Sequence, residues 1–151
     1  MAGKGVTSEG GFSAQERAAM KERAAELKAD ARRARAADRA AADEADVLAK
    51  IATMPPEDRA LAERVHSIVR TAAPELAPKL YYGQPGYARD GKVVCFFRSG
   101  QTDKERYSTF GFSVQAALDD DSGLWATSFA LVQPTEAAWE TLAALVRHAV
   151  E

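Results

Sequence analysis

The chain has 151 residues, of which 20 are lysine or arginine and 22 are aspartate or glutamate, giving a formal net charge of −2. This balance provides no overall positive field for nucleic acid or an acidic membrane, and no apolar run approaches the roughly 20 residues of a membrane span. The N-terminal residues lack the apolar segment of a secretory signal, and a single cysteine excludes an internal disulfide and a multi-cysteine zinc site. We therefore expect a cytoplasmic protein without nucleic-acid or membrane partners.

The first predicted elements form an N-terminal extension. Residues 1–12 show no periodicity and predict a flexible tail. Ser13 and Glu16 form a capping-box pattern that starts a helix to about residue 42, because thirteen of residues 13–43 are alanine. Met20 and Leu27 are the two large apolar residues of this extension, and they share one helix face. Residues 13–43 are therefore either a solvated helix or an arm that docks on a protein partner, or on the domain, through Met20 and Leu27.

Two further helices are predicted at the start and end of the domain that we place at residues 44–151. From Glu44 an apolar face leads to a helix end before Pro55. Pro56 then starts a helix whose stripe, at core-facing spacing, is Leu61, Val65, Ile68, Val69 and Ala72. Pro134 starts a last helix, with Trp139, Leu142, Val146 and Val150 towards the core.

Strand patterns lie between these helices. Asp90-Gly91 is a two-residue hairpin signal between residues 87–89 and 92–98. Residues 106–112 and 125–132 are the next predicted strands, with a turn cluster between them. The order predicts an α+β fold, with an antiparallel sheet of about four to five strands covered on one face by helices. A domain of this size buries enough surface to need no cofactor for folding.

The segment Lys79–Phe97, KLYYGQPGYARDGKVVCFF, carries a resemblance. With the preceding run from Met54, it resembles the YdhG-like family of small bacterial proteins, whose signature has an aromatic-Tyr-Gly-Met-Pro-Ala-Tyr corner before a hairpin. The later residues 124–129, LWATSF, resemble a longer subgroup with an N-terminal helical extension. Gln84 replaces the methionine and Gly86 the alanine of that corner. Gly86 would allow a type II turn with Pro85 as its first central residue.

The resemblance implies an α/β sandwich with a curved antiparallel sheet. Some members are described as frataxin-like iron chaperones, so it also implies an iron-handling function with a weakly bound ion on acidic surface residues. Two groups of carboxylates are candidates for that surface, since oxygen donors suit ferrous iron. They are Asp119, Asp120 and Asp121 in the turn cluster, and Glu57, Asp58 and Glu63 at the second helix. Each also has an ordinary explanation, as a solvated turn or as a helix start.

The aromatic corner is a second candidate site. An aromatic cleft is predicted from Tyr81, Tyr82, Gln84, Pro85, Tyr87 and Trp125. The alternative is that these rings pack in the core, as large aromatic side chains usually do.

Other chemistry is weakly indicated. His66 and His148 have no partner at metal-ligand spacing, and Cys95 alternates with apolar residues as a buried strand thiol does. No nucleophile–base motif or phosphate loop is present in the sequence. The sequence therefore predicts a non-enzymatic binding protein, with iron handling first, a small-ligand cleft second and a protein-interaction module third.

Overall fold

A computed structural model describes residues 12–151, so the predicted tail at 1–12 lies outside the described residues except for Phe12. The chain divides into two compact units, one ending at Arg39 and one comprising Ala40–Glu151. Helix α1 (Ala14–Ala52) begins at the predicted capping box. The Glu16 amide donates to Ser13 Oγ at 3.0 Å, and the Ser13 amide donates to Glu16 Oε1 at 2.8 Å. These bonds lower the pKa of the Glu16 carboxyl.

The predicted end of the first helix near residue 42 is wrong, because α1 continues without interruption to Ala52. The residues around 42 are alanine and acidic residues without proline or glycine, so nothing there ends a helix. Burial does change along the helix. Val47 and Ile51 are its buried residues, and both lie in the second unit.

Helices α2 (Pro56–Ala72) and α3 (Glu136–Ala149) follow the predicted patterns closely. Proline occupies the first turn of α2, and Thr135 caps α3 by accepting from the Ala138 amide at 3.2 Å. The two helices contact each other. Arg64 of α2 bonds Glu136 of α3 at 2.8 Å and lies over the Trp139 ring, so a charged pair and an aromatic face join the helices at their solvent side.

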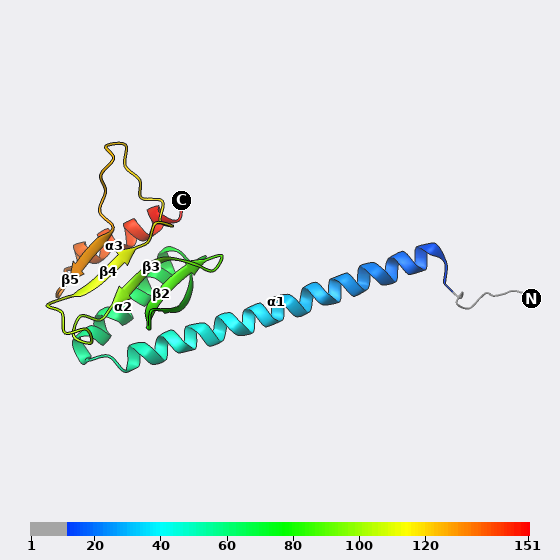
Figure 1. Cartoon of the computed structure of the whole chain (residues 1–151), viewed down its shortest axis with the longest axis horizontal. Coiled ribbons are helices and arrows are strands. Elements are labelled where there is room, and N and C mark those ends of the chain that lie inside the picture. Colours follow the sequence, from blue (N-terminus) through cyan, green and yellow to red (C-terminus); the bar gives the residue numbers. More distant parts are fainter. Residues whose placement is uncertain (1–11) are drawn as a thin grey trace, which may run out of the picture. The chain divides into compact units, whose positions relative to one another are not determined.

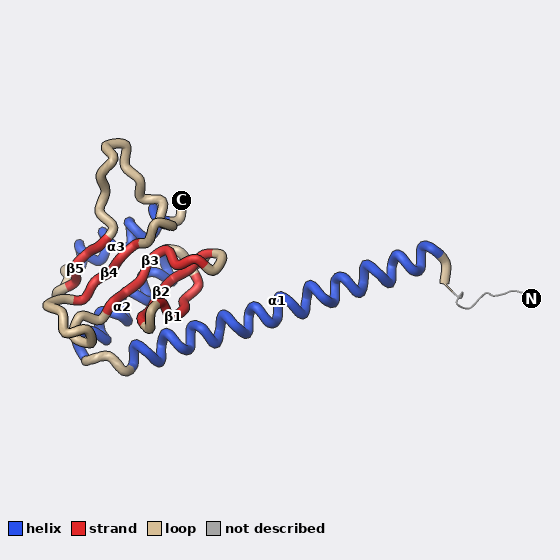
Figure 2. Tube along the Cα trace, in the orientation of Figure 1, coloured by secondary structure: helices blue, strands red, loops and turns tan. Residues whose placement is uncertain are grey.

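Five strands form one antiparallel sheet in the order of the sequence. They are β1 (Ala77–Tyr81), β2 (Gln84–Arg89), β3 (Lys92–Arg98), β4 (Ser108–Phe112) and β5 (Ser128–Leu131). Within this unit α2 and α3 lie behind one face of the sheet (Figure 1), and the strands run side by side from β1 to β5 (Figure 2). The predicted α+β fold is confirmed.

The hairpin between β1 and β2 corrects the predicted corner. Its turn is Tyr82-Gly83, with φ of 50° and 76°, and Pro85 and Gly86 lie within β2. The expected type II turn at Pro85-Gly86 is therefore wrong. Gly86 is required for a different reason: a Cβ there would lie 2.7 Å from Tyr81 Cβ and 3.1 Å from the Lys79 carbonyl oxygen. The absence of a side chain at Gly86 therefore allows β1 to lie this close to β2.

The second hairpin is as predicted, with Asp90-Gly91 in the left-handed region between β2 and β3. The later strands are shorter than expected. β4 begins at Ser108 rather than at residue 106, and residues 125–127 belong to the connection before β5. Trp125 is therefore a loop residue, whereas Leu131 belongs to the core and Phe129 packs against it.

The core of the second unit lies between the sheet and the helices. It includes residues from α1, both later helices and four strands, and it continues under the β4–β5 connection: Val47, Ile51, Val65, Val69, Tyr87, Cys95, Phe97, Phe110, Leu118, Leu131, Trp139 and Val146. The Ala117 amide donates to the Ala149 carbonyl at 2.8 Å, which fastens that connection to the end of α3.

Candidate functional site

The structure does not bring the predicted aromatic cleft together. Tyr82 projects from the β1–β2 turn and is 85 % exposed, whereas Tyr87 is fully buried. Trp125 lies in the β4–β5 connection, where it borders a shallow hollow with Asp119. Alternation along β2 turns Tyr87 inwards, and the positive φ of Tyr82 turns that ring out of the sheet. The predicted cleft is therefore wrong as a single site.

The other corner residues have structural contacts. Tyr81 packs against Phe96 at a ring separation of 5.3 Å and against Tyr82 at 4.7 Å. Pro85 is buried, and Gln84 Oε1 accepts from the Ser99 amide at 3.4 Å. Most of this corner therefore serves packing and strand ends.

A buried polar chain surrounds the Tyr87 hydroxyl. His66 Nδ1 lies 2.9 Å from the Tyr87 hydroxyl, and His66 Nε2 lies 3.0 Å from Glu44 Oε2. A neutral imidazole satisfies both contacts by donating a hydrogen bond from Nε2 to the carboxylate and accepting one from the Tyr87 hydroxyl at Nδ1. Arg70 Nε lies 3.7 Å from the same carboxylate oxygen. Burial and the neighbouring Cys95 and Glu44 raise the pKa of Tyr87, so its hydroxyl stays protonated.

This chain of groups joins α1, α2 and β2, and the sequence contained no local signal for it. Glu44, His66 and Tyr87 are about twenty residues apart from one to the next. Cys95 pairs with Tyr87 across the sheet, and burial raises the pKa of its thiol. Both potential nucleophiles are therefore enclosed, with no exposed surface for a substrate to reach.

The candidate metal residues are dispersed. Asp119, Asp120 and Asp121 are exposed in the β4–β5 connection, and Asp120 accepts from the Ser122 amide and hydroxyl, which lowers the pKa of its carboxyl. Glu57 and Glu63 are exposed on α2, and only Asp58 is buried. Over residues 12–151, no three carboxylate, imidazole or thiolate groups gather at distances that would hold a metal ion.

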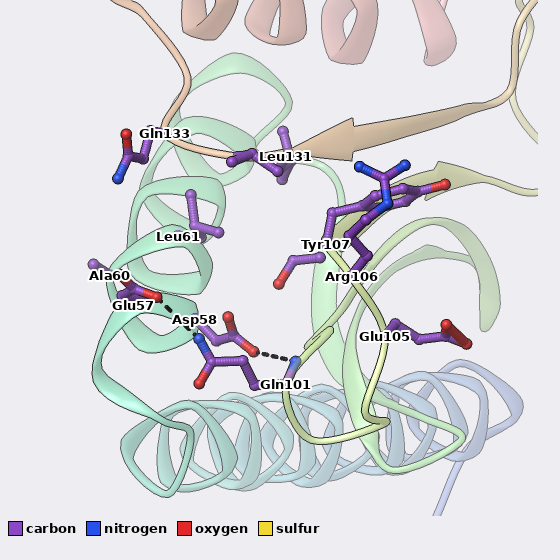
Figure 3. Close-up of a pocket in the computed structure, with 12 residues that line it drawn as sticks. Glu57, Asp58, Ala60, Leu61, Gln101, Glu105, Arg106, Tyr107, Leu131 and Gln133 are labelled. Carbon is purple, nitrogen blue, oxygen red and sulfur yellow. Dashed lines mark hydrogen bonds between the residues drawn. The ribbon is translucent and has the colours of Figure 1, made fainter.

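Another hollow, which contains the predicted site residues Glu57 and Asp58, lies at the start of α2. We call it the α2 pocket: a hollow of about 330 Å³ between the first turns of α2, the β3–β4 connection and the end of β5. Its apolar lining includes Leu61, Tyr107 and Leu131, and its polar lining includes Asp58, Gln101 and Arg106. Figure 3 shows Asp58, Leu61 and Leu131 around the space between the three segments, with the Tyr107 ring and Arg106 directed away from Asp58. The volume is at the small end of the range for ligand sites.

Asp58 forms one wall of the α2 pocket and holds its loop in place. The side chain is 4 % exposed. Its Oδ2 accepts from the Ser99 hydroxyl at 2.5 Å and from the Gln101 amide at 2.9 Å. Ser99 Oγ is also within 2.8 Å of Thr102 Oγ1. A carboxylate near the N-terminal end of a helix is stabilised by the helix dipole, so α2 and the loop both position this group.

The rim of the α2 pocket carries opposed charges that do not pair with each other. Glu57 accepts from the Gln101 side-chain amide at 3.0 Å. The Arg106 guanidinium lies 5.0 Å from the centre of the Tyr107 ring, and Figure 3 shows it beside that ring rather than towards Asp58. Glu105 lies on the same loop.

Sequence reasoning found Asp58 but missed Gln101, Arg106 and Tyr107. Residues 106–107 fit a strand pattern, so the sequence predicted them as part of a strand, whereas they belong to the β3–β4 connection. The run Ser99-Gly100-Gln101 was the available signal, since these residues favour turns.

Comparison of the chain with family models, with curated proteins and with solved structures found no match. No helix among the described residues is long and apolar enough to cross a membrane. The function is therefore argued from the site itself.

Proposed function

We propose that this chain is a non-enzymatic small-ligand-binding protein whose site is the α2 pocket. One observation carries the proposal: a nearly enclosed carboxylate, Asp58, lies in a pocket that also has apolar walls. Ligand pockets combine predominantly apolar walls with a few fixed polar groups, and the loop bonds of Asp58 fix its orientation.

The enclosed state of Tyr87 and Cys95 supports the non-enzymatic part of the proposal. A nucleophile must reach a substrate atom with its base within hydrogen-bond distance. His66 is such a base for Tyr87, but the Tyr87 hydroxyl belongs to a fully buried residue that a substrate does not reach. The hydroxyl that contacts a carboxylate of the α2 pocket is that of Ser99, which is buried and does not belong to the pocket lining.

The YdhG-like assignment and its iron-handling function remain proposals that rest on the resemblance of residues 54–97 and 124–129. The dispersed carboxylates give no specific support to iron binding. The resemblance is compatible with a ligand-binding function, because it implies a fold and does not specify the α2 pocket.

A fragment screen followed by amide NMR on the 15N-labelled protein tests the proposal. We expect fragments to shift the amides of Gly100, Gln101 and Leu131, which belong to or adjoin the pocket segments. Ala60→Trp should abolish these shifts, because Ala60 is an exposed residue of α2 that lines the pocket. Ala144→Trp on α3 is the matched control, since it adds the same ring to an exposed helix position away from the pocket.

Two results would contradict the proposal. One is a screen in which no fragment shifts the pocket amides. The other is binding at the pocket amides that Ala60→Trp leaves unchanged.

A further inference from the structure

The hydrogen-bonding capacity of Asp58 is only half used. Oδ2 accepts both of the bonds that the side chain makes, and no described residue donates to Oδ1. Over residues 12–151, no fully enclosed side-chain oxygen or nitrogen lacks a partner, so Oδ1 must be reachable from the pocket. Figure 3 shows this oxygen pointing away from the loop, into the space between the pocket walls.

The charge around the α2 pocket is unbalanced. Glu57, Asp58 and Glu105 supply three carboxylates, and Arg106 is the one basic residue of the lining. None of the ion pairs formed by residues 12–151 includes any of these three carboxylates. Arg106 stacks on Tyr107 instead, and it also borders a second hollow beside Arg98 and Thr109. The pocket therefore has an uncompensated negative charge.

The Asp58 carboxylate is held in place by its surroundings. A hydroxyl and a backbone N–H both donate to one oxygen, and the start of α2 adds a positive dipole. An ionised carboxylate is an acceptor only, so a ligand group that meets Oδ1 must donate a hydrogen bond. A ligand carboxylate or phosphate would be repelled there.

The pocket walls opposite the Asp58 carboxylate favour a ligand that has an apolar group. Leu61 and Leu131 come from α2 and β5, and Tyr107 comes from the β3–β4 connection. A ring or branched alkyl group placed between them would remove apolar surface from water. The volume of about 330 Å³ leaves room for a body that contains at least one ring.

We propose that the α2 pocket takes a small organic ammonium ion, with its ammonium group on Asp58 Oδ1 and an apolar body between Leu61, Tyr107 and Leu131. This inference rests on the proposed function and names its ligand class. An ammonium ion donates up to three hydrogen bonds, and its charge is complementary to Glu57 and Glu105 at the rim.

Benzylammonium, benzyl alcohol and benzoate are suitable probes, because they share one ring and differ in the charge of the attached group. Each is titrated into the 15N-labelled full chain while the pocket amides are followed. We expect benzylammonium to bind about tenfold more tightly than benzyl alcohol, since a charge-assisted bond is stronger than a neutral one. Benzoate should bind most weakly.

Variants test whether the carboxylates of the pocket cause the preference for benzylammonium over benzyl alcohol. Asp58→Asn replaces an acceptor-only group with an amide, so the affinities for benzylammonium and benzyl alcohol should come within about twofold of each other. Glu105→Gln serves as a second variant if Asp58→Asn does not fold, and it should reduce benzylammonium affinity alone. Glu63→Gln is the matched control, because it removes one exposed carboxylate from α2 outside the pocket lining, and it should leave the preference unchanged.

The outcomes separate this inference from the function on which it rests. Equal or tighter binding of benzyl alcohol or benzoate at the pocket amides overturns the ammonium assignment and leaves a ligand-binding pocket. Failure of all three probes to shift these amides overturns the assignment as well, and the fragment screen then decides whether the pocket binds anything.

Discussion

The Tyr87 hydroxyl lies inside the protein and connects β2 to α1 through two side chains. Its hydrogen bond to His66 and the bond from His66 to Glu44 satisfy three polar groups in a network that runs from the buried Tyr87 to the partly exposed Glu44. A satisfied buried network is stabilising only as long as each member keeps its partner.

Tyr87→Phe tests this dependence. The substitution leaves the ring in the core but removes the partner of His66 Nδ1, so we expect the free energy of unfolding to fall by about 1–2 kcal/mol. Urea denaturation followed by circular dichroism measures the change. Tyr82→Phe is the control, since its hydroxyl is on an exposed ring and its loss should change stability by less than about 0.5 kcal/mol. Equal effects of the two substitutions would count against the network.

The Cys95 thiol predicts how stability depends on alkaline pH. Burial raises its pKa in the folded state, so the native thiol keeps its proton where the unfolded chain loses it. Stability from this group is complete below the unfolded pKa of about 8.5 and falls above it, by up to about 1.4 kcal/mol per pH unit. The decline continues until the raised folded pKa is reached.

Cys95→Ala should make this decline shallower between about pH 9 and 10, below the ordinary pKa of tyrosine. The measurement is the slope of unfolding free energy against pH, because the absolute stability will also drop from the cavity that alanine leaves. Identical slopes in the two proteins would show that the thiol is not held protonated by burial.

At the scale of elements, the β3–β4 connection depends on Gly100. A Cβ at this position would lie 2.2 Å from the Tyr107 carbonyl oxygen and 2.8 Å from the Ser108 nitrogen. Both are backbone atoms that a side-chain rotation cannot move away. The close approach of the two ends of this connection shapes the α2 pocket, because Gln101 and Tyr107 both line it.

Gly100→Ala should therefore lower the free energy of unfolding by about 3 kcal/mol, at the upper end of the usual cost of overpacking. Gly111→Ala is a useful comparison. Its Cβ would meet the Phe96 ring at 2.5 Å, but that ring is only partly buried and can turn aside. We expect a smaller loss for Gly111→Ala, and thermal unfolding of both variants would contradict the argument if the order were reversed.

Local sequence signals predicted the elements well where a pair of residues is typical of a single kind of structure. Asp90-Gly91 favours a two-residue hairpin, and Pro134-Thr135 precedes a helix start, and both are as expected. The Tyr82-Gly83 turn was not predicted, because tyrosine rarely adopts a positive φ and the adjacent Gly-Gln-Pro-Gly run offered a more familiar turn. The end of α1 was predicted too early. The change of sequence pattern near residue 42 precedes the buried positions of the helix, and the helical conformation continues through it.

The candidate site was harder to predict than the fold. The α2 pocket joins residues 57–61, 101–108 and 131–133, and no spacing rule relates such distant segments. Asp58 was recognisable as a helix-start carboxylate, but its burial depends on Ser99 and Gln101 from another connection. Asp58 therefore lies at an ordinary helix-start position, and it becomes part of the pocket wall only because the β3–β4 connection packs against α2.

At the scale of the whole molecule, the two compact units differ in burial. Along α1 the buried residues are Val47 and Ile51, both beyond the boundary at residue 39. A protein without residues 1–39 should keep the amide NMR spectrum of residues 50–151, and its melting temperature should stay within about 2 °C of the full chain.

Removing seven more residues provides the contrast. A protein without residues 1–46 loses Glu44, the partner of His66, and should lose about 1–3 kcal/mol of stability. An equal loss from both truncations would show that the first unit contributes directly to the stability of the second.

The order of the strands in the sheet has a consequence for how the protein folds. Every paired strand is the next one along the chain, from β1 to β5, and the first two pairs are joined by two-residue turns. Such pairings close small loops, whose entropic cost is low. The contact between α2 and α3 joins segments more than sixty residues apart. We expect the closing of such distant contacts to add to the entropic barrier to folding, and hairpins that form early shorten the effective distance to be closed.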